Sequence, residues 1–202
     1  MNATDITAFL LESPVELSAF LLSVMYVWLN ARQNIWCWPV GGASVLLYAY
    51  VFFDSRLYAD ALLQLIYLGF SIYGWVNWKK IQTTPDTTPV VTLYKKPVVI
   101  GRYLIATAIL FWGAYQVLTT VAGATLRQWD ALTFALSLTA TYWSARKIIE
   151  NWPLWIITNL LYVGIYLYRG LELTAFLSVI MIVLSGYGWV KWRGELKKTQ
   201  PA

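Results

Sequence analysis

The sequence predicts an all-α integral membrane protein with seven transmembrane helices, arranged as two parallel three-helix repeats joined by a single linking helix (3+1+3). Three observations lead to this fold class. Of the 202 residues, 59% are hydrophobic and 12% are charged, about half the charged fraction of an ordinary soluble domain. The apolar residues gather in seven stretches long enough to cross a bilayer. The second half of the chain also repeats the first.

The seven apolar stretches divide the chain into parts. The polar, proline-bearing segment WKKIQTTPDTTPVVTLYKKP is the one long connection between them. We expect an extracellular segment 1–14, a first bundle 15–80, a linker with its helix 81–128, a second bundle 129–195 and a cytoplasmic tail 196–202. The predicted helices cover about 15–31, 36–54, 58–78, 98–119, 129–146, 152–169 and 173–192, each close to the length of about 20 residues that spans a membrane.

Basic residues predict how these helices are oriented. When loops are sorted alternately, only Arg56, Arg127 and Arg169 of the fifteen basic residues fall on one side. Because Lys and Arg are enriched in cytoplasmic loops, the N-terminus is expected outside and the C-terminus in the cytoplasm. Most of the ten acidic residues fall on the outer side. Either topology and helix N-terminal charge explain them, or they weakly attract arriving cations.

The residue inventory excludes several kinds of chemistry. The chain has no histidine, and Cys37 is its single cysteine. Histidine metal sites, Ser-His hydrolysis and histidine proton relays are therefore excluded, as is a disulfide framework. No Asp or Lys lies in the middle of a span, so neither an enzyme nor a proton-coupled carrier is expected. No cofactor or metal is expected, and the charge of +5 is explained by the loops rather than by nucleic-acid binding.

An offset of 114 residues superimposes the two bundles without a gap. The WP pair at 38–39 falls on the WP pair at 152–153, and YGWVNW at 73–78 falls on YGWVKW at 187–192. Since each repeat holds three helices, the extra helix keeps both copies in one orientation, with a pathway expected between the bundles. The matching prolines are either first-turn residues, where a missing N–H costs nothing, or hinges.

A single asymmetric solute needs a site where the repeats differ. Trp155 falls opposite Gly41, and Asn159 falls opposite Val45. Trp152, Trp155 and Asn159 share one helix face, with Asn159 about 10 Å deeper than Trp152. Because an unpartnered amide is costly in lipid, this face is expected to point into the bundle, with two indole rings above an amide.

Other interpretations of these residue types remain open. Tryptophan is common in the aromatic belts at membrane surfaces, and Trp152 fits that alternative too. Serine and threonine also serve helix packing. The belt interpretation is favoured for Trp36, Trp78, Trp129 and Trp192. Further candidate solute contacts are Gln64, Tyr67 and Asn77 on the third span, Thr141 on the fifth and Ser178 on the seventh.

The candidate side chains suit one class of solute. Aromatic faces without a buried basic residue favour a flat ring that carries positive charge. Amide groups orient such a ring by hydrogen bonds to hydroxyl or amine groups. An anionic or phosphorylated solute would need Arg or Lys in the middle of the membrane, and the spans contain none.

Two segments, WCWPVGGASVLLYAYVFFDSRLYADALLQLIYLGFSIYGWVNW and DALTFALSLTATYWSARKIIENWPLWIITNLLYVGIYLYRGL, resemble the Pnu family of bacterial vitamin transporters. The resemblance covers roughly 16–80 and 128–195. It implies a full-length SWEET-like fold in the bacterial inner membrane, and facilitated diffusion with trapping by a cytoplasmic vitamin kinase. The family motif W-x-x-W-x-x-x-N/D matches Trp152, Trp155 and Asn159, which implies that these three residues bind the substrate.

The resemblance leaves the solute open. Nicotinamide riboside is placed first and thiamine is the alternative, since both are flat cations. A vitamin-binding membrane subunit that needs a separate energising partner is the alternative from another class. The expected partners are the vitamin, the lipid bilayer and, functionally, the kinase; nucleic acid is not expected, and a homo-oligomer is left open.

Overall fold

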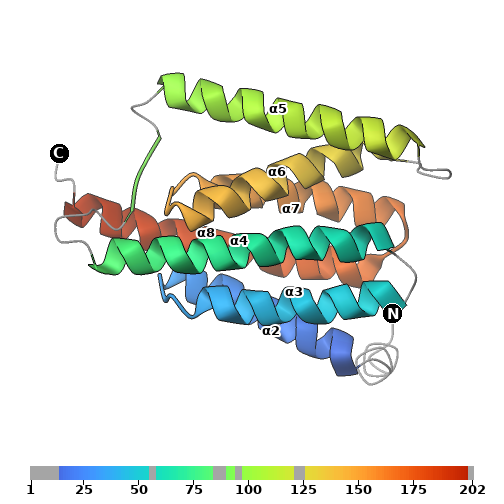
Figure 1. The fold of residues 1–202 in the computed structure, drawn as a ribbon, viewed down its shortest axis with the longest axis horizontal. Helices are drawn as coiled ribbons and strands as arrows, with labels where there is room; N and C mark the ends of the chain where they lie inside the picture. The colour runs from blue at the N-terminus through green and yellow to red at the C-terminus, as the bar shows by residue number, and fades with distance from the viewer. Residues whose placement is uncertain (1–13, 55–57, 84–89, 94–96, 121–125, 200–202) are drawn as a thin grey trace. The chain divides into compact units, whose positions relative to one another are not determined.

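The computed structural model describes residues 14–54, 58–83, 90–93, 97–120 and 126–199. These residues form seven helices in chain order, so the expectation of an all-helical chain with seven helices is confirmed (Figure 1). The predicted segment 1–14 lies almost wholly outside the described residues. The helices are α2 (Pro14–Ala31), α3 (Cys37–Asp54), α4 (Tyr58–Thr83), α5 (Pro97–Thr120), α6 (Arg127–Ala145), α7 (Asn151–Tyr168) and α8 (Glu172–Thr199).

Two helices extend further than their apolar stretches. α4 continues to Thr83 and α8 to Thr199, whereas the predicted ends are at 78 and 192. Lysine and glutamate are good helix formers, and Lys197 and Lys198 lie in the last turn of α8, where positive charge complements the helix dipole. Lys198 also pairs with Glu195 at 2.8 Å. Hydrophobicity therefore located the apolar spans and missed the polar turns that continue them.

Four helices are long and apolar enough to cross a membrane by composition alone: α2, α3, α5 and most of α8. The remaining three described helices, α4, α6 and α7, do not meet this criterion, and each includes polar side chains. In α6 and α7 many of these are buried, among them Thr141, Ser144, Thr158 and Asn159. A composition criterion counts such residues against a span even though they face the protein interior.

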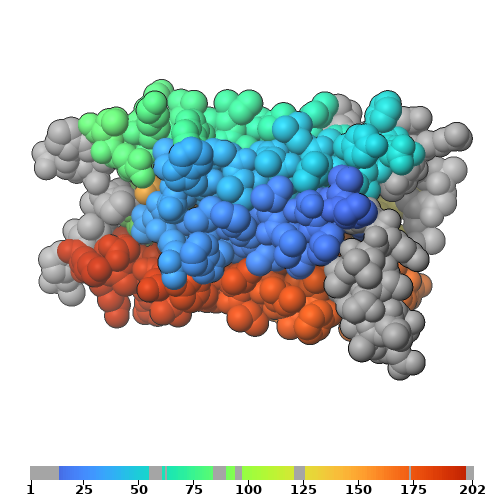
Figure 2. Space-filling view, turned by 90° about the horizontal axis from the view of Figure 1, so that it is seen from below, coloured from blue at the N-terminus to red at the C-terminus, as the bar shows by residue number. Residues whose placement is uncertain are grey.

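The chain divides into two compact units, 1–80 and 81–202. In the first unit α2 packs on α3, and Figure 2 shows these two helices side by side. α3 also contacts α4 through the rings of Trp38 and Trp78. In the second unit α5 packs on α6, α6 on α7 and α7 on α8. The linking helix therefore belongs to the second unit.

The linking helix α5 packs on α6 through one face. None of its residues is buried. The Thr107 and Thr139 hydroxyls lie 2.8 Å apart, and the Tyr103 ring lies edge-on to Trp143, with centroids 5.5 Å apart. α5 is thus anchored through one face near its first half, while much of its remaining surface is apolar and exposed.

Candidate functional site

Both units contain the same tryptophan contact at positions 114 residues apart. Trp38 in α3 lies edge-on to Trp78 in α4, with ring centroids 5.6 Å apart and an interplanar angle of 87°. Trp152 in α7 lies edge-on to Trp192 in α8, at 5.4 Å and 88°. All four rings are at most 2% exposed. This edge-to-face geometry is a favourable one for aromatic pairs.

A glycine in each unit makes room for these rings. A Cβ on Gly74 would overlap the Trp38 ring, and one on Gly188 would lie 2.6 Å from the Trp152 ring. The glycine stands four residues before the second tryptophan of each pair, in the repeated YGWV sequence. We call each glycine with its two tryptophans the tryptophan clasp of its unit.

The clasps correct two of the belt interpretations. Trp78 and Trp192 are completely buried, so their interpretation as membrane-surface residues was wrong. Trp36 and Trp129 are 60% and 42% exposed, as a belt position requires. Trp152 is also a buried packing residue, which excludes the belt alternative for it; its role in binding the solute stays a prediction.

The last two residues of the α7 motif, Trp155 and Asn159, are less completely buried than Trp152. Trp155 is partly exposed and Asn159 is 7% exposed. Within the described residues the Asn159 side chain makes one hydrogen bond, from Nδ2 to the carbonyl oxygen of Trp155 at 2.8 Å. That bond satisfies a donor inside the helix and leaves the Oδ1 acceptor for another group. An indole face and an amide acceptor are therefore available one turn apart.

The matching region of the first unit is filled differently. A Cβ on Gly41, which matches Trp155, would lie 2.8 Å from the Tyr26 ring. The residue that matches Tyr26 in the second unit is Ala140, which is fully buried. The bulky ring thus comes from α2 in the first unit and from α7 in the second. Sequence reasoning missed Tyr26; the signal was the reciprocal exchange of large and small residues at the 114-residue offset.

Thr141 and Ser178 are buried hydroxyls of the second unit. Each donates to a carbonyl oxygen of its own helix: Thr141 to Ser137 at 2.8 Å and Ser178 to Thr174 at 3.0 Å. The Ser137 hydroxyl also lies 3.3 Å from the hydroxyl of Tyr162 on α7. These hydroxyls can satisfy themselves without a solute, so packing accounts for them as well as binding does.

Gln64, Tyr67 and Asn77 lie on α4 of the first unit, and all three are partly exposed. The carbonyl oxygen of Tyr67 accepts a hydrogen bond from the Ser71 hydroxyl at 3.1 Å. The structure therefore brings Trp152, Trp155, Asn159, Thr141 and Ser178 into one unit and describes the α4 residues in the other. A site shared by both units stays a prediction.

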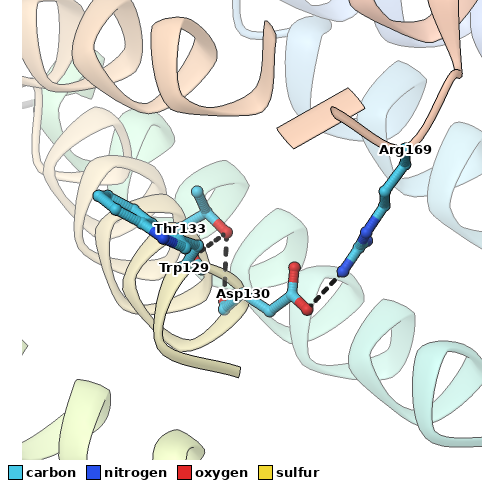
Figure 3. Close-up of polar contacts among 4 residues, drawn as sticks. All are labelled: Trp129, Asp130, Thr133 and Arg169. Carbon is cyan, nitrogen blue, oxygen red and sulfur yellow. Dashed lines mark hydrogen bonds and ion pairs between the residues drawn. The ribbon is translucent and has the colours of Figure 1, made fainter. Parts of the chain in front are cut away.

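An ion pair joins the first turn of α6 to the C-terminal end of α7 (Figure 3). Arg169 Nη2 lies 2.7 Å from Asp130 Oδ2, with both side chains about a third exposed. The Thr133 hydroxyl donates to the carbonyl oxygens of Trp129 and Asp130 at 3.0 and 3.1 Å. Because Arg169 offsets its charge, Asp130 contributes less to the predicted acidic outer surface than its sequence position suggests.

Comparison with known proteins places the chain in a family. A family model described as nicotinamide mononucleotide transporter matches residues 13–194. The chain is 24% identical to the nicotinamide riboside transporter PnuC of Escherichia coli, over 88% of this chain and 84% of that protein. It is also 24% identical to the riboflavin/roseoflavin transporter RibM of Streptomyces davaonensis, over 85% and 81%.

A solved structure supports the same assignment at the level of the fold. A crystal structure of the vitamin B3 transporter PnuC matches with a TM-score of 0.74 and 22% identity, covering 98% of this chain and 88% of that one. The expected resemblance to Pnu-type transporters, rather than to an enzyme, is confirmed. Since the family model covers most of its length, the chain belongs to the nicotinamide mononucleotide transporter family.

Proposed function

We propose that this protein carries a flat, positively charged vitamin, nicotinamide riboside in the first place, into the bacterial cytoplasm by facilitated diffusion. Phosphorylation by a cytoplasmic kinase would then trap the vitamin and maintain net uptake. One observation carries the proposal: α7 presents the Trp155 ring and the Asn159 amide on one face, where the first unit has Gly41 and Val45. The site is therefore asymmetric within a duplicated scaffold.

The charge of the solute follows from where the basic residues are. The family description names a mononucleotide, while the relative from Escherichia coli is named for the riboside; the two solutes differ by a phosphate. In the second unit Arg127, Lys147 and Arg169 lie at helix ends or in turns, and Lys191 and Arg193 are exposed in the last third of α8. A phosphate at the depth of Asn159 would lack a cationic partner. A pyridinium ring over Trp155, with Asn159 bound to a hydroxyl or carboxamide, meets no such cost.

Two other solutes belong in any test. Thiamine is also a flat cation and remains the alternative. The similarity to RibM adds riboflavin, whose ring system is flat but uncharged. A neutral ring would use the stacking face of Trp155 without the cation–π contribution, so sensitivity to solute charge separates the candidates.

The 3+1+3 parallel, SWEET-like arrangement, with the N-terminus outside, is part of the proposal. Two features shared by the units support the repeat. Each has a tryptophan clasp, and Gln33 and Lys147, which match at the same offset, both have positive φ angles, 55° and 53°. Non-glycine residues rarely adopt this conformation, so its recurrence indicates one turn used twice. The basic residues concentrated in alternate loops support the orientation.

Transport by the purified protein in liposomes tests this function. Labelled nicotinamide riboside should equilibrate across the membrane without an ion gradient, because the spans hold no titratable group in mid-membrane. Unlabelled thiamine, riboflavin and nicotinamide mononucleotide serve as competitors, and the mononucleotide should compete least. Accumulation driven by protons or sodium would contradict facilitated diffusion. Tight binding without transport would instead favour the alternative of a capture subunit with a separate energising partner.

A further inference from the structure

Residues 90–93 of the linker, which we call the linker strap, bind the turn between α6 and α7. Val91 and Ile148 form a parallel β-bridge. The Val91 N–H donates to the carbonyl oxygen of Lys147 at 3.0 Å, and the Ile149 N–H donates to that of Val91 at 2.9 Å. Val90 is 0% exposed. The strap is therefore held by main-chain hydrogen bonds and buried at its first residue.

Glu150 fastens the strap to the start of α7. Its Oε1 accepts hydrogen bonds from the Thr92 hydroxyl at 2.5 Å and from the Leu93 N–H at 2.8 Å. Leu93 is 4% exposed. Hydrogen bonds to a carboxylate are stronger than those between neutral groups. α7 begins at the next residue, Asn151, and its first turns carry Trp152 and Trp155.

Among the described residues, the corresponding turn of the first unit has no carboxylate in the place of Glu150. Gln33 matches Lys147 in position and φ angle, but the residue that matches Glu150 is Trp36, which is 60% exposed. An indole ring has no oxygen to accept hydrogen bonds. This turn is instead closed locally, by the Trp36 N–H donating to Asn34 Oδ1 at 3.0 Å. The chemistry of the strap is specific to the second unit.

We propose that the linker strap is a permanent part of the second unit that fixes the start of α7, with Glu150 as a positioning residue for solute binding. Glu150 acts through the placement of Trp155 and Asn159 and does not touch the solute. Contacts of Thr107 and Tyr103 with α6 hold the next part of the same segment. The strap, α5 and the second bundle then move as one body during transport. The inference rests on the proposed function, because its readout is vitamin binding.

Substitutions of Glu150 test the positioning role. Glu150→Ala removes the acceptor and should weaken nicotinamide riboside binding about 3- to 10-fold, which lies within the range for residues that act without touching the ligand. Glu150→Gln keeps an oxygen acceptor and should restore most of the affinity. Hydrogen exchange at the amides of Val91 and Leu93 should rise in the alanine variant and stay slow in the glutamine variant.

Control experiments separate the role of the strap from that of the α5–α6 contact and from the proposed function itself. Thr107→Val removes an α5–α6 hydrogen bond but leaves the strap intact, so affinity should be unchanged. Wild-type affinity in Glu150→Ala despite fast exchange in the strap would overturn the inference, as would equal losses of affinity in the alanine and glutamine variants. Failure of the wild-type protein to bind the vitamin would instead contradict the proposed function.

A reversible disulfide between the strap and the α6–α7 turn tests whether the strap stays bound during transport. Neighbouring strands lie about 4.8 Å apart, within the Cα spacing of disulfides, so Val91→Cys with Ile148→Cys should cross-link in a Cys37→Ala background. We expect the oxidised protein to transport at the rate of the same protein after reduction. Loss of transport on oxidation that reduction restores would show that the strap must open, and would overturn the proposal.

Discussion

The two units have the same clasp, yet they fill the space beside it from opposite helices. In the first, Tyr26 of α2 lies against Gly41 of α3. In the second, the large residue is Trp155 on α7, and α6 has the small residue Ala140. The comparison indicates that the duplicated scaffold is kept at the clasps. The proposed solute site lies a turn away, where the large ring changes helix and Asn159 stands in place of Val45.

The largest effect on stability is expected when a methyl group is added to the glycine of a tryptophan clasp. Gly188→Ala would place a Cβ 2.6 Å from the Trp152 ring, and such overpacking costs about 1–3 kcal/mol. The melting temperature of the purified protein should fall clearly. Gly186→Ala is the matched control in the same helix, because nothing lies within 4 Å of its added Cβ. Equal melting temperatures for both variants would refute the role assigned to the clasp.

Trp155, which has no counterpart at the matching position of the first unit, should matter for solute binding more than for folding. Trp155→Ala removes a stacking face worth about 1–2 kcal/mol to a desolvated cation, which corresponds to about a 5- to 30-fold rise in Kd. Titration of the folded variant with nicotinamide riboside measures it. Trp112→Ala, on the exposed surface of α5, is the control and should bind normally. Unchanged affinity in Trp155→Ala would place the solute elsewhere.

Moving the large residue of the first unit from α2 to α3 imitates the second unit and tests whether Tyr26 and position 41 share one space. Gly41→Trp alone should destabilise the protein and should not rescue Trp155→Ala, because Tyr26 already occupies the space. Combining it with Tyr26→Ala should recover about 1 kcal/mol, within the range of coupling between residues in contact. A double-mutant cycle on unfolding free energies measures this coupling. Additive effects would mean that Tyr26 and Gly41 do not share that space.

The smallest effect is expected at the Asp130–Arg169 ion pair. Arg169→Gln should cost about 0–1 kcal/mol, as is usual for partly exposed pairs, and the loss should shrink at high salt because exposed charges are screened. Melting temperatures at two salt concentrations measure it, with Glu195→Gln as the control at the other exposed pair. Transport should be unchanged; a strong loss would assign this end of the second unit to the solute pathway.

Much of the fold could be predicted from sequence because lipid imposes a simple pattern. The seven apolar stretches located the seven helices, and the repeated YGWV sequence marked the 114-residue offset at which both clasps occur. Sequence did not reveal that Trp78 and Trp192 are buried, since a tryptophan near the end of a span has the same pattern whether it meets lipid or another ring. The preceding glycines, Gly74 and Gly188, were the missed signal.

The site was only partly predictable for a related reason. Comparing the repeats singled out Trp155 and Asn159, because a difference within a repeat is visible in one sequence. Tyr26 escaped notice because its role depends on a contact between helices. The strap escaped too: a bridge between single residues such as Val91 and Ile148 has no periodicity, and its partners are far apart along the chain.

The strap also sets an order of events during biosynthesis. The Trp38–Trp78 contact can form once Trp78 has left the ribosome, so the first unit has all the partners of its clasp early, as is usual for N-terminal parts of a chain. The strap must wait, since Glu150 is synthesised after the whole of α5 and α6. The linking helix therefore enters the bilayer before the residues that anchor the segment ahead of it exist.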